Sequence, residues 1–268
     1  MKRAVRSPEP RATSARGLKL TFRVWRQASA DKPGAFELYP LSDVRPELTL
    51  LEALDQLNDA LVAEGKDPIA FDSDCREGIC GACGITVDGV PHGPVQNTPS
   101  CRQHVRSFTD GSTITLEPFR AASFSIVKDL AVDRAGLGRI IEAGGFVSMD
   151  AGTAPDADGH QLAQGRAEAA LDMAACIGCG ACVAACPNGS ANLFTGSKLA
   201  HLSMLPTTRA ERGLRAHRMI EAMEREFGPC SVYGECSRAC PAGIPLEAIA
   251  AVNREKLRSV FRGPSRDD

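Results

Sequence analysis

The chain has 268 residues, of which 43% are hydrophobic and 24% are charged. This composition is typical of a folded protein, and the length predicts two domains. The formal net charge of −2 leaves no basic excess to neutralise phosphates, which argues against nucleic acid as a partner. We expect no secretory leader, because polar and proline-rich sequence follows the first residues, and the eleven cysteines then favour bound metal over disulfide bonds.

Residues 1–16 are expected to form a disordered basic arm. They carry five basic side chains against one acidic side chain, and Pro8 and Pro10 lie among them. An organelle transit peptide is the alternative interpretation. The two prolines interrupt the amphipathic helix that such a peptide needs, so we favour the arm.

Residues 17–120 are predicted to form a small α+β domain. Three strands are expected in it, at 18–24, 36–39 and 113–117. Thr49, with Glu52 three residues later, is a capping box that starts a helix between the second and third strands. The dipeptide Asp88-Gly89 lies between short apolar segments and predicts a hairpin. A cysteine-bearing loop therefore connects the helix to the hairpin.

The second half is predicted to be helical. Glycines and an Asp/Gly/Pro-rich stretch mark 121–160 as a connecting region, and 161–268 as an all-α domain. Helices are expected at 163–172, 209–227 and 245–261. The 25 residues of 173–197 carry no charged side chain, a length that can span a bilayer. They hold a proline and four cysteines, so we interpret them as uncharged wrapping around a buried group.

The first cysteine set has the spacing of a plant-type ferredoxin. Cys75, Cys80 and Cys83 are spaced C-x4-C-x2-C, and Cys101 follows at a distance. This is the pattern for a [2Fe-2S] cluster, whose iron takes soft thiolate ligands. The alternative is a zinc site, which prefers paired C-x2-C motifs.

The second run of cysteines is typical of bacterial ferredoxins. Cys176, Cys179, Cys182 and Cys186, followed by a proline, are spaced C-x2-C-x2-C-x3-C-P. In proteins with two such clusters, the fourth cysteine of a run ligates the other cluster. The assignment is then Cys176, Cys179, Cys182 and the crossing Cys240 for a [4Fe-4S] cluster.

A third run lacks its middle cysteine, and Tyr233 stands in that position. The remaining ligands are Cys230, Cys236 and the crossing Cys186, so the three sets together use all eleven cysteines. Three thiolates without a fourth fit a [3Fe-4S] cluster. The alternative is a four-iron cluster completed by water or another ligand. Three clusters of different type indicate a path for single electrons.

The motifs resemble those of a known family. The segments SDCREGICGACG at 73–84, CIGCGACVAACPN at 176–188 and CSVYGECSRACP at 230–241 are similar to the signatures of the iron–sulfur subunit of succinate dehydrogenase and fumarate reductase. The resemblance is strongest to the actinobacterial, menaquinone-linked type with a single membrane-anchor subunit. It implies an N-terminal plant-type ferredoxin (β-grasp) domain and a C-terminal all-α bacterial dicluster ferredoxin-like domain.

The resemblance also implies a function and partners. The family works in a succinate:quinone oxidoreductase on the cytoplasmic face of the bacterial membrane. An FAD-containing flavoprotein subunit oxidises succinate to fumarate, and electrons pass through the [2Fe-2S], [4Fe-4S] and [3Fe-4S] clusters to quinone at the membrane anchor. This chain then carries no substrate chemistry of its own. A fumarate reductase running in reverse and a free-standing multi-cluster ferredoxin are the alternatives.

Two positions depart from relatives with a quinone pocket beside the [3Fe-4S] cluster. Those relatives have a tryptophan and a histidine where this chain has Ala191 and Ser231. The departure suggests that electrons leave through haem b in the membrane anchor. The anchor subunit would also bind menaquinone.

Overall fold

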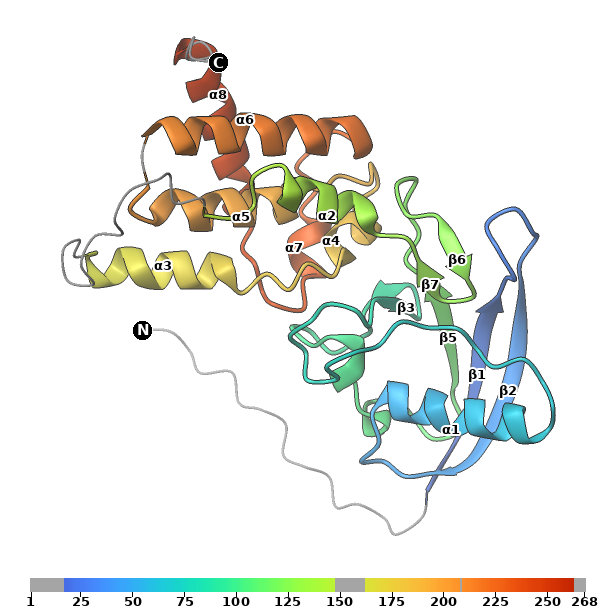
Figure 1. The fold of residues 1–268 in the computed structure, drawn as a ribbon. Coiled ribbons are helices and arrows are strands. Elements are labelled where there is room, and N and C mark those ends of the chain that lie inside the picture. Colours follow the sequence, from blue (N-terminus) through green and yellow to red (C-terminus); the bar gives the residue numbers. More distant parts are fainter. Residues whose placement is uncertain (1–16, 148–161, 208, 263–268) are drawn as a thin grey trace.

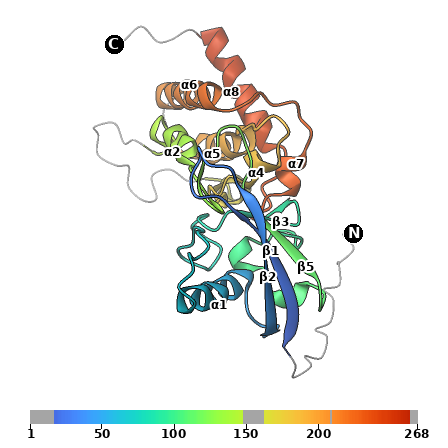
Figure 2. The ribbon, with the colours of Figure 1, turned by 90° about the vertical axis from the view of Figure 1, so that its right-hand side faces the viewer.

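The computed structural model describes residues 17–147, 162–207 and 209–262. The expected basic arm and the Asp/Gly/Pro-rich stretch at 150–159 lie outside the described residues. The described chain forms an N-terminal domain built on a sheet and a C-terminal helical domain, which lies above the sheet in the view of Figure 1. Figure 2 shows the same two parts after a quarter turn. The α+β layout agrees with the sequence prediction.

The N-terminal domain contains a five-stranded sheet in the order β2-β1-β5-β3-β4. The strands are β1 (Leu18–Arg26), β2 (Ala35–Val44), β3 (Ile85–Val87), β4 (Val90–Pro91) and β5 (Thr113–Pro118). β1 and β5 pair in parallel, and the other pairs are antiparallel. Strand β2 is longer than the expected 36–39, because its backbone stays paired with β1 from Ala35 to Val44.

Local signals in this domain are confirmed by the structure. Helix α1 (Leu50–Ala63) starts at Thr49, whose side chain accepts from the Glu52 N–H while the Glu52 carboxylate accepts from the Thr49 N–H at 2.7 Å. Asp88 and Gly89 connect β3 and β4 as a hairpin, both with positive φ. The buried face of α1 packs with apolar side chains of the sheet in one core that includes Leu54, Phe22 and Leu116.

The C-terminal domain is a bundle of helices. They are α3 (Gln164–Ala174), α4 (Ala181–Ala185), α5 (Asn192–Met204), α6 (Arg209–Glu226), α7 (Glu235–Arg238) and α8 (Ala248–Arg262). Helix α5 contacts α3, α6 and α8, and lies between α3 and α6 in Figure 1. The helix expected from 245 begins at Ala248, because residues 248–250 donate to carbonyls three positions back and form a tight turn first.

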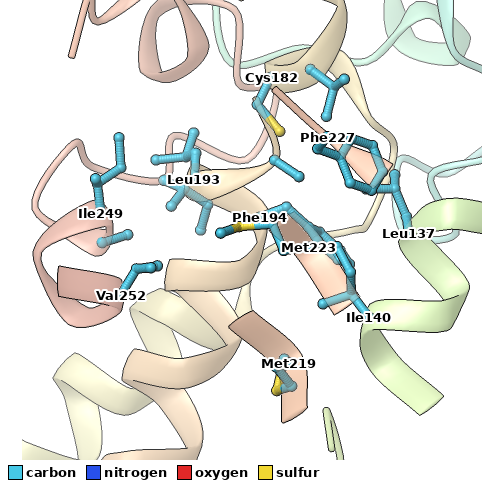
Figure 3. Close-up of a cluster of buried hydrophobic side chains, with 14 of the residues drawn as sticks. Leu137, Ile140, Cys182, Leu193, Phe194, Met219, Met223, Phe227, Ile249 and Val252 are labelled. Atoms are coloured by element: carbon cyan, nitrogen blue, oxygen red, sulfur yellow. The ribbon is translucent and has the colours of Figure 1, made fainter. Parts of the chain in front are cut away.

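The expected connecting region contains ordered structure. It holds a two-stranded ribbon of β6 (Ile126–Lys128) and β7 (Ala131–Val132), followed by α2 (Ala135–Glu142). Leu137 and Ile140 of α2 belong to the same buried cluster as Phe194 of α5 and Met223 of α6 (Figure 3). This part of the chain therefore contributes to the core of the helical domain.

Helix α5 was not expected from the sequence. Nine of its residues are buried, among them polar residues such as Thr195 and Ser197. Because both polar and apolar residues of this helix are buried, its apolar side chains form no separate stripe, and the periodicity that predicts helices is absent from it. The uncharged segment 173–197 thus ends inside the bundle core.

Candidate metal centres

The first cysteine set lies on the loop between α1 and β3, together with the short helix η1 (Ser100–Arg102). Cys83 and Cys101 are buried, Cys75 is half-buried and Cys80 is exposed. The loop contains Arg76, Gly78 and Gly81 in left-handed conformations. These turns direct several backbone N–H groups toward the sulfur atoms of Cys75 and Cys80.

Backbone N–H groups converge on two of these sulfurs. The N–H groups of Glu77, Ile79 and Cys80 donate to Cys75 Sγ at 3.3, 3.4 and 3.3 Å. The N–H of Ala82 donates to Cys80 Sγ at 3.4 Å. Hydrogen bonds from these N–H groups lower the pKa of Cys75 to about 6, whereas burial raises the pKa of Cys83 to about 12. The donors fit a [2Fe-2S] cluster, because such clusters are tuned by hydrogen bonds to sulfur.

The second set surrounds a hollow in the helical domain, which is numbered after the set as the second hollow. Cys176, Cys179, Cys182 and Cys240 line about 330 Å³ of empty space, together with Leu193 and Phe194 at the start of α5. The crossing cysteine, Cys240, therefore lies beside Cys182, which is 58 residues before it in the sequence.

Burial raises the pKa of three thiols in this set. It raises the pKa of Cys179 to about 12 and the pKa of Cys182 well above its ordinary value. It also raises the pKa of Cys240, although the N–H of Ile244 donates to that sulfur at 3.4 Å. A buried thiolate needs a compensating positive centre, and iron provides one by replacing the proton. The four thiols thus fit a buried [4Fe-4S] cluster.

The third set surrounds another hollow, the third hollow. Cys186, Cys230 and Cys236 line about 320 Å³ of empty space, with Tyr233 in the wall where a fourth cysteine would stand. Tyr233 is 63% exposed, so the tyrosine side of the hollow lies at the protein surface. Three sulfurs and one open corner fit a [3Fe-4S] cluster better than a complete four-iron one.

The three sets follow one another through the molecule. Leu193 lines both hollows and is the side chain that they share. The first loop contacts the second directly, because a Cβ placed on Gly81 would lie 2.3 Å from the carbonyl oxygen of Ile177. Sequence reasoning missed Leu193, since one leucine in an uncharged segment carries no signal of its own.

Among the described residues, no three His, Cys, Asp or Glu side chains are grouped closely enough to hold a single metal ion. The part of the chain that the structure describes contains no helix that is long and apolar enough to cross a membrane.

The two positions that depart from the family pattern lie near the third set. Ala191 is fully buried and precedes α5. Ser231 lines the third hollow, and its hydroxyl accepts from the Asn188 side-chain amide at 2.8 Å.

Comparisons with known proteins agree with this arrangement. Residues 21–138 match the model of a 2Fe-2S iron–sulfur cluster binding domain, and 172–244 match that of a 4Fe-4S dicluster domain. The chain is 29% identical over 251 residues to the succinate dehydrogenase iron–sulfur subunit of Bacillus subtilis, with 91% of this chain and 94% of that protein covered. It is 28% identical over 265 residues to the fumarate reductase iron–sulfur subunit of Wolinella succinogenes, with 91% and 99% covered.

A solved structure shares the fold. One chain of the Mycobacterium smegmatis Sdh1 complex in the apo form aligns with a TM-score of 0.66 at 19% identity, covering 96% of this chain and 100% of that one. Fold and cysteine sets together define an iron–sulfur protein with a two-iron domain followed by a dicluster domain. Over 91% of its length the chain is similar to iron–sulfur subunits of succinate dehydrogenase and of fumarate reductase.

Proposed function

We propose that this chain is the electron-transfer subunit of a succinate:quinone oxidoreductase, which connects an FAD-containing flavoprotein subunit to quinone at a membrane anchor. The observation that supports this most directly is the succession of three cysteine sets. The first set shares a backbone contact with the second, and the second shares Leu193 with the third. When bound, iron–sulfur clusters supply one-electron acceptors.

The residues of this chain hold and tune those groups. We assign the [2Fe-2S] cluster to Cys75, Cys80, Cys83 and Cys101, the [4Fe-4S] cluster to Cys176, Cys179, Cys182 and Cys240, and the [3Fe-4S] cluster to Cys186, Cys230 and Cys236. Backbone N–H groups at Cys75 stabilise thiolate sulfur. The apolar side chains of Leu193 and Phe194 exclude water from the second hollow. Lys198 donates to the Cys176 carbonyl at 3.3 Å and places a cation beside that loop.

The ligand assignment is tested by Tyr233→Cys. The wild-type complex should contain about nine iron atoms per chain and an oxidised EPR signal from the three-iron centre. The new thiol stands at the open corner, so the variant should gain about one iron atom and lose that signal. Tyr233→Ser, which changes the same exposed side chain without adding a thiol, is the matched control. An unchanged oxidised spectrum in Tyr233→Cys would show that the third set is assigned wrongly.

The partners are tested by purification of the whole complex from membranes. We propose a flavoprotein subunit and a membrane anchor with haem b and menaquinone, held at the cytoplasmic face. The absence of the family's tryptophan and histidine, at Ala191 and Ser231, supports an exit through haem. A complex that lacks haem and still reduces quinone at full rate would contradict this exit.

Fumarate reduction is a second candidate, favoured by the identity to the Wolinella succinogenes subunit. The same clusters serve both directions, because direction depends on the potentials of donor and acceptor. Rates of succinate oxidation and fumarate reduction by one purified complex distinguish the two activities.

A further inference from the structure

One arginine connects the ligand loops of the first two cysteine sets. Arg134 lies between β7 and α2, outside every cysteine motif. Its Nη1 donates to the Gly81 carbonyl at 2.6 Å and to the Cys179 carbonyl at 2.9 Å, and its Nη2 donates to the Ala82 carbonyl at 2.9 Å. A single guanidinium thus binds the backbone on both sides of the contact between the domains.

These three bonds need the shape of an arginine. A guanidinium presents five donors in a rigid plane, whereas a lysine ammonium is a compact charge on a flexible stem. The two ligand loops are packed closely beside the Arg134 guanidinium, because a Cβ on Gly81 would also lie 3.0 Å from the Cys179 amide nitrogen. The arginine therefore fixes the spacing of backbone segments that carry ligands of two different sets.

The charge of Arg134 is only partly balanced. Its side chain is 18% exposed, and the carboxylate of Asp72 lies 3.6 Å away, itself 48% exposed. A cation in a partly buried position interacts strongly with nearby charge, since the effective dielectric is lower there than in water. Reduction adds one negative charge to a cluster, and local charge is one of the factors that set its potential.

We propose that Arg134 is a positioning residue for electron transfer between the first and second clusters. Its hydrogen bonds hold the two ligand loops together, and its positive charge favours the reduced state of both clusters. This inference rests on the proposed function, because it requires that both loops hold clusters.

The test is a redox titration of the whole purified complex, followed by EPR. Arg134→Gln should lower the equilibrium constant for reducing each of the two clusters about tenfold, which is about 59 mV for a one-electron couple. Arg134→Lys keeps the charge, so it should change each constant less than about threefold. A residue with a purely structural role would not shift the potentials according to charge.

The matched control is Arg139→Gln. Arg139 lies in α2, is 54% exposed and donates to Glu226 at 2.6 Å, away from the cysteine loops. The same loss of charge there should leave both potentials unchanged. Equal potentials in Arg134→Gln and wild type, or equal shifts in Arg134→Gln and Arg139→Gln, would overturn the proposal.

A second variant decides the matter if Arg134→Gln loses iron. Asp72→Asn removes the exposed carboxylate that partly neutralises Arg134, so both potentials should rise. Unchanged potentials in that variant would then overturn the proposal. Failure of the proposed function is recognised separately, because wild-type protein would then purify without the flavoprotein and membrane-anchor subunits, or would lack the iron and the EPR signals.

Discussion

The contact between the first two ligand loops makes a sharp prediction for Gly81→Ala. Gly81 has a φ of +72°, and a Cβ there would lie 2.3 Å from the Ile177 carbonyl oxygen. The left-handed conformation costs an alanine about 1–2 kcal/mol. Restoring an ordinary contact requires the Ile177 backbone to move by about 1 Å, and overpacking of this kind costs about 1–3 kcal/mol more.

The variant should therefore lose about 2–5 kcal/mol of stability, which lowers the melting temperature by about 5–15 °C for a chain of this size. Gly111→Ala separates the two costs. Gly111 has a φ of +79°, and apart from its two chain neighbours no described residue has an atom within 4 Å of the added Cβ. Gly111→Ala should carry only the cost of the left-handed conformation, which lowers the melting temperature by about 2–6 °C.

The assay is a thermal scan of each holoprotein, with loss of the visible cluster absorbance as the signal and iron content measured beforehand. The difference between the two variants reports the contact between the loops. If Gly81→Ala and Gly111→Ala have the same melting temperature and Gly81→Ala retains its full iron content, the two loops do not touch as described.

Three further predictions concern the N-terminal domain, each measured as a change in the melting temperature of the holoprotein. Thr49→Ala removes the helix cap and should cost about 1 kcal/mol, whereas Thr49→Ser should restore most of it. Asp129 is 1% exposed and accepts from Arg26 Nε at 3.1 Å and from the backbone N–H groups of Gln27 and Ala70, so Asp129→Ala should cost about 3–5 kcal/mol by leaving these donors without their acceptor; a loss below about 1 kcal/mol would contradict this. Burial lowers the pKa of His92 to about 3, so the unfolded chain binds the proton first, and the stability present above about pH 6.5 declines as pH falls toward 3. The loss between about pH 7.5 and 5.5 should be about 1 kcal/mol, and it should disappear in His92→Gln; an equal pH dependence in that variant would assign the loss to other groups.

Short-range features of this chain were predictable from sequence because their physics is local. A capping box needs one hydrogen bond in each direction between Thr49 and Glu52, so their spacing identifies the start of α1. The hairpin at Asp88-Gly89 depends on two residues that adopt positive φ. Cysteine spacing carries the same kind of information, because one loop must bring several thiolates to one cluster.

Other features depend on contacts between distant segments. Helix α5 buries nine of its 13 residues, polar ones among them, so its sequence lacks the apolar stripe by which helices are predicted. The connecting region supplies Leu137 and Ile140 to the helical core, although its glycines indicated a domain junction. Tertiary packing overrode the local pattern in both places.

The cysteine motifs alone predicted a division of the thiols into sets of four, four and three, because iron–sulfur ligation imposes its spacing on the sequence. Only the tertiary structure decided how the sets follow one another. Leu193 between the second and third hollows, and Arg134 across the loops of the first and second sets, carry no sequence motif. Arg134 bonds to carbonyl groups 45 or more residues away, and Leu193 lines hollows whose cysteines come from separate segments; such packing leaves no local pattern in the chain.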